Sequence, residues 1–291
     1  MAACLALGLA LVLGLDARPA QAQDAATLQA RQASLREALT SSPFQRPLVL
    51  ESQQDANDLR GDVYAVVEQP FSVVSSALQG SAHWCELLML HLNVKGCTAS
   101  GTAPNEQVDL AVGRKFDQPL ADTYALSFHF TMPALAADYL RMEMTAANGP
   151  MGTRDYRLML EAVALDATHS FLHMTYAYSF GLAARLAMQG YLATIGSGKV
   201  GFSIVGHGSE GRPVYIDGVR GVIERNTMRY FLAIDVYLGS TTVPAAQRLD
   251  RQLTDWFAAV ERYPVQLHEL ERAQYLDMKH REFERLRSTA K

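Results

Sequence analysis

The sequence lacks most of the features that mark specialised protein classes. Only 3 of its 291 residues are cysteine and 2 are tryptophan. Lysine and arginine are interspersed with aspartate and glutamate, and the formal net charge is −4. The clustered basic face that nucleic-acid binding requires is therefore missing, so we expect no nucleic-acid partner. Internal repeats and low-complexity linkers are also missing, which leaves a globular chain with one main domain as the simplest organisation.

Long apolar runs are missing too, with one exception at the N-terminus. Residues 4–15, CLALGLALVLGL, are uniformly apolar but too few to span a bilayer, which needs roughly 20 residues. Pro19 and a small-x-small site ending at Ala22 follow this run. The pattern predicts a signal peptide over residues 1–22, cleaved after Ala22, and hence a periplasmic or secreted protein. One element of the signal-peptide pattern is missing, since no Lys or Arg precedes the run, and a membrane anchor is the alternative.

Two cysteines remain after such a cleavage, Cys85 and Cys97. An exported chain enters an oxidising compartment, where two nearby cysteines can form a disulfide worth about 2–3 kcal/mol. The alternative is a metal site, because His83 and His91 lie close to both cysteines. Their spacing matches no familiar zinc pattern, so we favour the disulfide and predict no metal and no cofactor.

Hydrophobic periodicity divides the rest of the chain into helical and extended parts. We expect an N-terminal helical arm over residues 23–60, with its helix at 24–40, and a charged helical tail over 263–291. Between them lie two short helices separated by Gly80, a helix at 182–195, and a helix at 248–263. Alternation with period two predicts antiparallel strands, at residues 61–68, 93–100, 107–116, 123–132, 139–147, 154–165, 169–180, 200–206, 212–221 and 218–238.

The order of these elements resembles the START-like, helix-grip superfamily, which includes polyketide cyclases and lipid-transfer proteins. The resemblance covers residues 61–262. The stretch GDVYAVVEQPFSVVSSALQGSAHWCELL looks like the opening unit of that fold, a strand followed by two short helices ending near a Trp. LTDWFAAVERY looks like its closing helix. The resemblance implies an α+β fold in which a curved antiparallel sheet grips a long C-terminal helix, with a cavity for an apolar ligand between them.

One predicted strand, GVRGVIERNTMRYFLAIDVYL at 218–238, combines charges with a long apolar run. If it is a strand, its even positions turn from polar to apolar along one face. The odd-numbered Arg225 and Arg229 then face solvent, with Asp155, Arg157 or Glu161 as cross-strand partners if the strands adjoin. We therefore expect the even face to line the cavity, together with aromatic and methionine side chains from the other strands. The candidate ligand-binding residues are Glu224, Asn226, Met228, Tyr230, Tyr124, Phe128, Tyr156, Met174, Tyr176 and Tyr178. The alternatives are a filled aromatic core and a Glu224 that only pairs with an arginine and holds the sheet together.

Two motifs that suggest other chemistry fail on their context. Gly206 to Gly211 spells G-x-G-x-x-G, but a strand rather than a helix follows, so we interpret it as a hairpin loop. The nucleophile elbow G-x-S-x-G is missing from the sequence. His169 and His173 are expected on a solvated strand face, where the pair would bind a metal only weakly.

Three functions remain open at this point. The first is an exported binding or carrier protein for a hydrophobic small molecule or lipid, with possible peripheral membrane contact. The second is a cyclase or aromatase-type enzyme that uses the same cavity, with Glu224 or a tyrosine as acid or base. The third is an envelope protein whose C-terminal helix docks a partner.

Overall fold

The computed structural model describes residues 24–194 and 196–289, so the predicted signal peptide lies outside the described residues. The fold is α+β and is built on one eight-stranded antiparallel sheet with the order β1-β2-β8-β7-β6-β5-β4-β3. The predicted alternation is confirmed for seven of these strands. The strands of the sheet are β1 (Leu48–Asp55), β2 (Asp58–Val67), β3 (Val94–Ser100), β4 (Glu106–Val112), β5 (Tyr124–Leu135), β6 (Tyr139–Asn148), β7 (Thr153–Ala164) and β8 (Ser170–Phe180).

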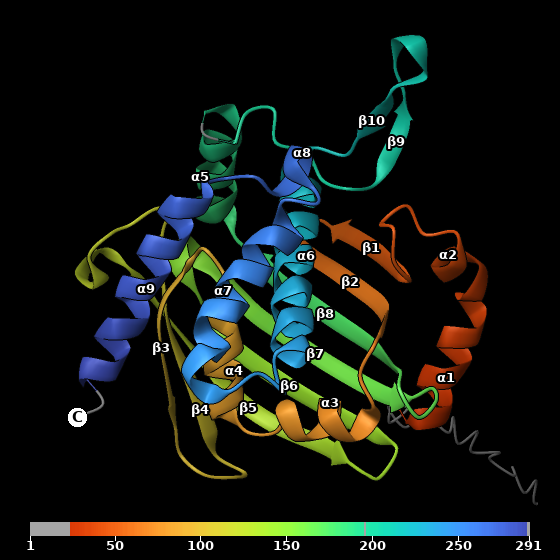
Figure 1. Cartoon of the computed structure of the whole chain (residues 1–291). Coiled ribbons are helices and arrows are strands. Elements are labelled where there is room, and N and C mark those ends of the chain that lie inside the picture. Colours follow the sequence, from red (N-terminus) through yellow and green to blue (C-terminus); the bar gives the residue numbers. More distant parts are fainter. Residues whose placement is uncertain (1–23, 195, 290–291) are drawn as a thin grey trace, which may run out of the picture.

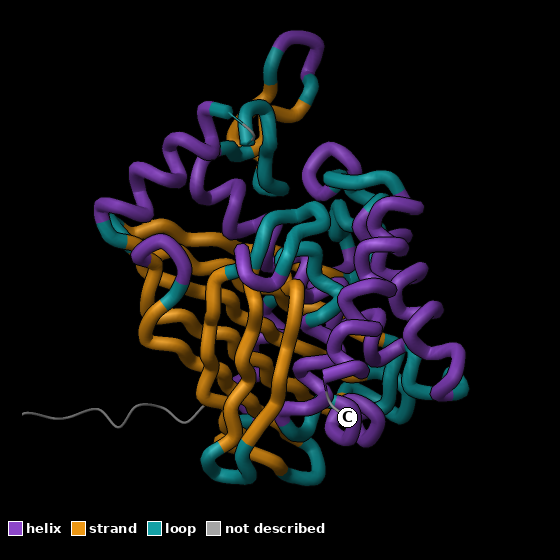
Figure 2. The backbone as a smooth tube through the Cα atoms, turned by 90° about the vertical axis from the view of Figure 1, so that its left-hand side faces the viewer, coloured by secondary structure: helices purple, strands orange, loops and turns teal. Residues whose placement is uncertain are grey.

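Helices cover the concave face of the sheet, and the two views in Figures 1 and 2 show sheet and helices as separate layers. A small hairpin of β9 (Ile204–His207) and β10 (Pro213–Tyr215) extends away from this body (Figure 1). The hairpin confirms that the G-x-G-x-x-G segment is a loop. The helices are α1 (Ala25–Ser34), α2 (Arg36–Thr40), α3 (Phe71–Ala77), α4 (Ser81–Leu88), α5 (Leu182–Ala193), α6 (Gly218–Gly239), α7 (Ala245–Val260), α8 (Pro264–Leu267) and α9 (Arg272–Thr289).

The predicted strand at 218–238 is wrong, because this segment forms the long helix α6. The helix lies between the sheet and α7, and nearly every side chain from Gly221 to Leu238 is buried. Because α6 is enclosed on most sides, its apolar residues occupy every face and it shows no clear amphipathic stripe. Its run of aromatic and β-branched residues therefore looks like a buried strand, and only its length, far above the usual strand, speaks for a helix.

The helix that the sheet grips is therefore α6, whereas the segment expected in that role forms α7 and packs on the outer side of α6. Gly61 of β2 allows the close approach of α6. A Cβ atom at this position would lie 2.2 Å from Oγ1 of Thr227, which is closer than any real contact. Because Gly61 has no side chain, α6 can pack closely against β2.

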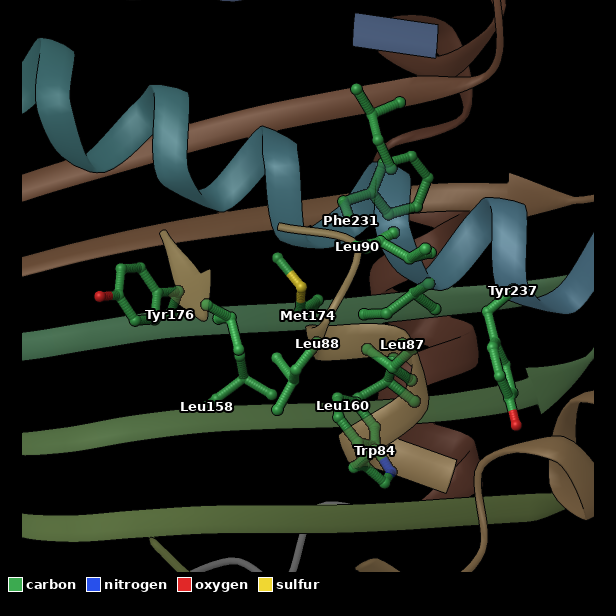
Figure 3. Packing of buried hydrophobic residues seen from close by; sticks show 14 of the residues in the cluster. Trp84, Leu87, Leu88, Leu90, Leu158, Leu160, Met174, Tyr176, Phe231 and Tyr237 are labelled. Carbon is green, nitrogen blue, oxygen red and sulfur yellow. The ribbon is translucent and has the colours of Figure 1, made fainter. Parts of the chain in front are cut away.

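The interior between the sheet and the helices is largely filled. Trp84 and Leu87 of α4 pack in the same layer as Leu160 of β7 and Met174 of β8 (Figure 3). All four side chains are fully buried, and the Trp84 indole donates a hydrogen bond to the carbonyl of Leu78. The alternative of a filled aromatic core therefore holds for this part of the molecule.

The disulfide between Cys85 and Cys97 is confirmed, and it joins α4 to the edge strand β3. Because both sulfur atoms are in this bond, the alternative metal site with His83 and His91 is excluded. The bond fixes the two short helices to the end of the sheet that lies farthest from β1.

Both ends of the expected domain extend further than the sequence indicated. Within the expected N-terminal arm, β1 pairs with β2 as an edge strand, and Leu28 of α1 packs on the outer face of the sheet. At the other end, Tyr275 and Lys279 of α9 are fully buried, so the tail is not the solvated helix that its charges suggest. The described residues include no helix with the length and hydropathy needed to cross a bilayer.

Candidate functional site

A cavity of about 570 Å³ opens at the end of the sheet where β8 leads into α5. It lies between the first half of α6, the ends of β7 and β8, and the segment that follows β4. Its size falls in the range of small-molecule sites. The lining residues are His91, Asn93, Val112, Gly113, Arg114, Gln118, Asp122, Tyr124, Pro150, Met151, Thr153, Tyr156, Tyr176, Tyr178, Ala184, Ala187, Met188, Val222, Asn226 and Tyr230.

Four tyrosines form one wall of this cavity. The ring of Tyr156 stacks on Tyr178 at 5.2 Å, and Tyr176 lies 5.0 Å from Tyr230 of α6. Burial raises the pKa of Tyr176, Tyr178 and Tyr230 above the usual value, so these phenols stay neutral at physiological pH. Neutral phenols combine large apolar faces with hydroxyl groups that can bind a polar atom of a ligand.

His91 is a polar group of the cavity wall that sequence reasoning considered only as a metal ligand. Its ring stacks on Tyr230 at 4.5 Å, and its Nδ1 accepts a hydrogen bond from the backbone N–H of Asn93. The proton of the neutral ring is therefore on Nε2. This atom is buried and has no hydrogen-bond partner in the described part of the chain. Burial, followed by the charge of Arg229, holds the pKa of His91 well below its usual value.

The helical geometry of α6 divides the candidate residues expected on one strand face. Residues four apart share a face of a helix, and Val222, Asn226 and Tyr230 accordingly line the cavity. Glu224 and Met228 lie on another face and are fully buried away from it. The side-chain amide of Asn226 has no hydrogen-bond partner among the described residues, so it is available to a ligand.

Glu224 fastens the loop before β9 and the edge strand β1 to α6. Its carboxylate accepts hydrogen bonds from the backbone N–H groups of Phe202 and Ser203, at 2.6 and 2.9 Å. It also accepts from the hydroxyls of Ser52 and Ser203, at 2.6 and 2.7 Å. Glu224 is therefore structural, but through serines and backbone rather than through the arginine partner that the sequence suggested.

The remaining candidates fall partly inside and partly outside the cavity wall. Tyr124, Tyr156, Tyr176 and Tyr178 line the cavity, although Tyr124 lies at its rim and is 51% exposed. Met174, Met228 and Phe128 belong to the filled core instead. The strand alternation found the correct face of the sheet in each case, but it could not show where along that face the core ends and the cavity begins.

The arginines expected to face solvent, Arg225 and Arg229 of α6, are buried instead. Arg225 and Arg229 are each 1% exposed and line a second space of about 200 Å³ beside the cavity. The expected cross-strand partners Asp155, Arg157 and Glu161 lie elsewhere. Glu161 instead hydrogen-bonds His173 on the outer face of the sheet, so His173 is buried there and not solvated.

No family model matches the chain, and no curated protein does. Matches among solved structures include a START superfamily protein from Mycobacterium smegmatis, with 13% identity over 42% of this chain and 78% of that chain and a TM-score of 0.32. An aromatase/cyclase from Streptomyces sp. R1128 has 10% identity over 71% and 95%, with a TM-score of 0.33. A norcoclaurine synthase from Thalictrum flavum has 11% identity over 50% and 93%, with a TM-score of 0.32.

The chain has a START-like, helix-grip fold. Its own architecture carries this statement, since an eight-stranded antiparallel sheet encloses the long helix α6.

Proposed function

We propose that the protein binds a hydrophobic small molecule or lipid in the tyrosine-lined cavity and acts as an exported binding or carrier protein. The observation that carries this proposal is the cavity of about 570 Å³, whose wall combines five tyrosines with His91. The buried Nε2 of this histidine has no hydrogen-bond partner among the described residues. The tyrosine and methionine faces favour an apolar body. The His91 N–H and the Asn226 amide favour one polar atom on the ligand.

Export is part of the proposal and is supported by two independent features. The apolar run and small-x-small site over residues 1–22 have the pattern of a signal peptide. The disulfide between Cys85 and Cys97 suits an oxidising compartment. A direct check is N-terminal sequencing of the protein from a periplasmic extract, which should begin at Gln23.

The catalytic alternative based on Glu224 loses its main residue, because this carboxylate lies outside the cavity and accepts four hydrogen bonds there. The alternative of a C-terminal docking helix is also weakened, since α9 buries Tyr275 and Met278 in the fold itself. Ligand binding is the function that the described geometry supports best.

Ligand extraction tests the proposal. Protein purified without detergent should release a stoichiometric apolar compound on denaturation, detectable by mass spectrometry. The neutral fluorophore N-phenyl-1-naphthylamine should bind to protein stripped of this compound. Ala187→Trp, which places an indole in the cavity wall, should lower its affinity at least about tenfold. Leu186→Trp on the exposed side of the same helix is the matched control and should bind normally. An empty protein that binds no fluorophore would contradict the proposal.

A further inference from the structure

The tyrosine-lined cavity continues into a second, smaller space with a different character. This space, of about 200 Å³, shares four lining residues with the cavity, so the two adjoin along α6. The shared residues are Asn93, Met188, Val222 and Asn226. Its remaining lining residues are all cations, namely Lys115, Arg225 and Arg229. We call this space the basic annex. An apolar cavity thus leads directly to a group of positive charges.

The carboxylate of Glu269 interacts with three cations beside the annex. Oε1 of Glu269 accepts hydrogen bonds from Lys115 and from Arg229, the latter at 2.8 Å, and Oε2 lies 3.5 Å from Nζ of Lys199. Arg225 donates to the backbone carbonyl of Val200 at 3.1 Å. Among these five side chains there are four cations and one anion. An anion that entered this space would be stabilised by the cations that line it.

The ionisation of the cluster agrees with an excess of positive charge. Burial and the neighbouring charge of Arg229 lower the pKa of Lys115 to about 8, although Glu269 acts in the opposite direction. Burial raises the pKa of Glu269, but the charges of Arg229 and Lys115 outweigh this effect and lower it overall. The carboxylate is thus held firmly in its charged form, while the cations repel one another.

Two of these cations have a structural role within the chain. Arg229 donates to the carbonyl of Leu267 and Lys199 to that of His268, so both help to hold the segment before α9. Lys115, which also bonds Glu269 of that segment, and Arg225 line the annex together with Arg229. A ligand that extends from the cavity past Asn226 would therefore enter a space that Lys115 and Arg225 line.

We propose that the ligand is amphipathic and acidic: its apolar body lies against the tyrosines, and its anionic group, a carboxylate or phosphate, occupies the basic annex between Lys115 and Arg225. This inference rests on the proposed ligand-binding function and narrows the class of ligand. Hydrogen bonds from charged donors to an anion are stronger than neutral ones, and they gain further where water is excluded. The annex selects acids over neutral apolar compounds of the same size.

Two fluorophores that share one aromatic skeleton test this proposal. 8-Anilinonaphthalene-1-sulfonate carries a sulfonate group, and N-phenyl-1-naphthylamine is the same molecule without it. We expect the sulfonate to bind stripped protein more tightly. Lys115→Gln should weaken its binding about tenfold and leave the affinity of the neutral compound unchanged. Lys115 suits this substitution because Glu269 keeps its contacts with Arg229 and Lys199.

The control is Arg212→Gln on the β9–β10 hairpin, which removes one positive charge from an exposed side chain. It should change neither affinity. Equal affinities of the two fluorophores for the wild type, or an equal effect of Lys115→Gln on both, would overturn the acidic-ligand proposal while the binding function stands. Failure of both fluorophores to bind would contradict the binding function itself.

Competition separates the two kinds of anion. Decanoate and decyl phosphate should each displace the sulfonate fluorophore at lower concentration than decanol, which has the same chain length and no charge. Whichever of the two acids displaces the fluorophore at the lower concentration identifies the anionic group that the annex prefers. Displacement by decanol at the same concentration as by both acids would overturn the proposal.

Discussion

The imidazole of His91 stacks on the ring of Tyr230, with their centroids 4.5 Å apart and their planes within 22°. This contact joins the loop after α4 to the gripping helix α6 at the wall of the cavity. Burial, then the charges of Arg229, Lys279, Lys115 and Lys95, lower the pKa of His91. The stack therefore contains a neutral imidazole whose buried Nε2–H has no partner among the described residues.

Acid should destabilise the protein through His91. Because its pKa is lower in the folded state, the unfolded chain binds the additional proton as the pH falls below about 6.5. The free energy of unfolding should thus decrease from pH 7 to pH 5. His91→Asn, whose side-chain oxygen can still accept from the N–H of Asn93, should remove this part of the decrease. Urea unfolding at several pH values measures the effect. Parallel pH profiles of variant and wild type would show that His91 does not carry it.

His173 should act with the opposite sign. It lies between Asp62 and Glu161 on the outer face of the sheet, at 2.9 and 2.7 Å. Burial opposes its charge, but the hydrogen bonds to the two carboxylates outweigh this and raise its pKa. Its contribution is therefore complete below about pH 6.5 and is lost as the pH rises through the folded-state pKa.

The variant His173→Gln tests this second linkage. The stability difference between wild type and variant should be largest near pH 6 and should decrease toward pH 9. Over this range Asp62 stays ionised, since its pKa is lowered by the hydrogen bonds from His173 and Arg60 despite burial. Arg60 and Arg141 at the two carboxylates keep their charge as well. A difference that grows with pH would contradict the assignment.

Glu224→Gln should destabilise the fold and spare the cavity. The amide would direct N–H groups at the donors of Phe202 or Ser203, which leaves buried groups unpaired and costs about 2–4 kcal/mol. Thermal unfolding and N-phenyl-1-naphthylamine binding below the transition temperature measure the two effects separately. The control is Glu210→Gln on the exposed hairpin, which should leave the stability unchanged. Loss of binding without loss of stability would instead place Glu224 at the ligand.

Tyr275→Ala should cost about 3–5 kcal/mol, because the ring is fully buried and stacks on Trp256 at 5.0 Å. Its hydroxyl also donates to the carbonyl of Leu90. Arg281→Ala on the exposed side of α9 is the control and should change the stability by less than about 0.5 kcal/mol. If both variants unfold at the wild-type denaturant concentration, α9 is the solvated tail that its sequence suggests.

Local sequence was sufficient for much of the sheet. Alternation with period two located seven of its strands, and the faces carrying Tyr156 and Tyr176 are the buried ones, as predicted. A strand with one face toward a core must alternate, so this signal is present in the sequence itself. The disulfide and the resemblance to the helix-grip fold could also be predicted, because they depend on residue types and on the order of elements along the chain.

Only the tertiary structure decided the nature of residues 218–238 and hence the site. A helix enclosed by a sheet and a second helix loses the periodic signal that a solvent-facing side provides. Once the segment is helical, Asn226 and Tyr230 turn to the cavity, and Glu224 turns to the loop that it fastens. The basic annex was equally hidden, because Lys115, Arg225 and Glu269 are distant in sequence and only packing brings their charges together. The sequence determined the sheet through local alternation, whereas the cavity and its charges depend on long-range contacts that no local pattern records.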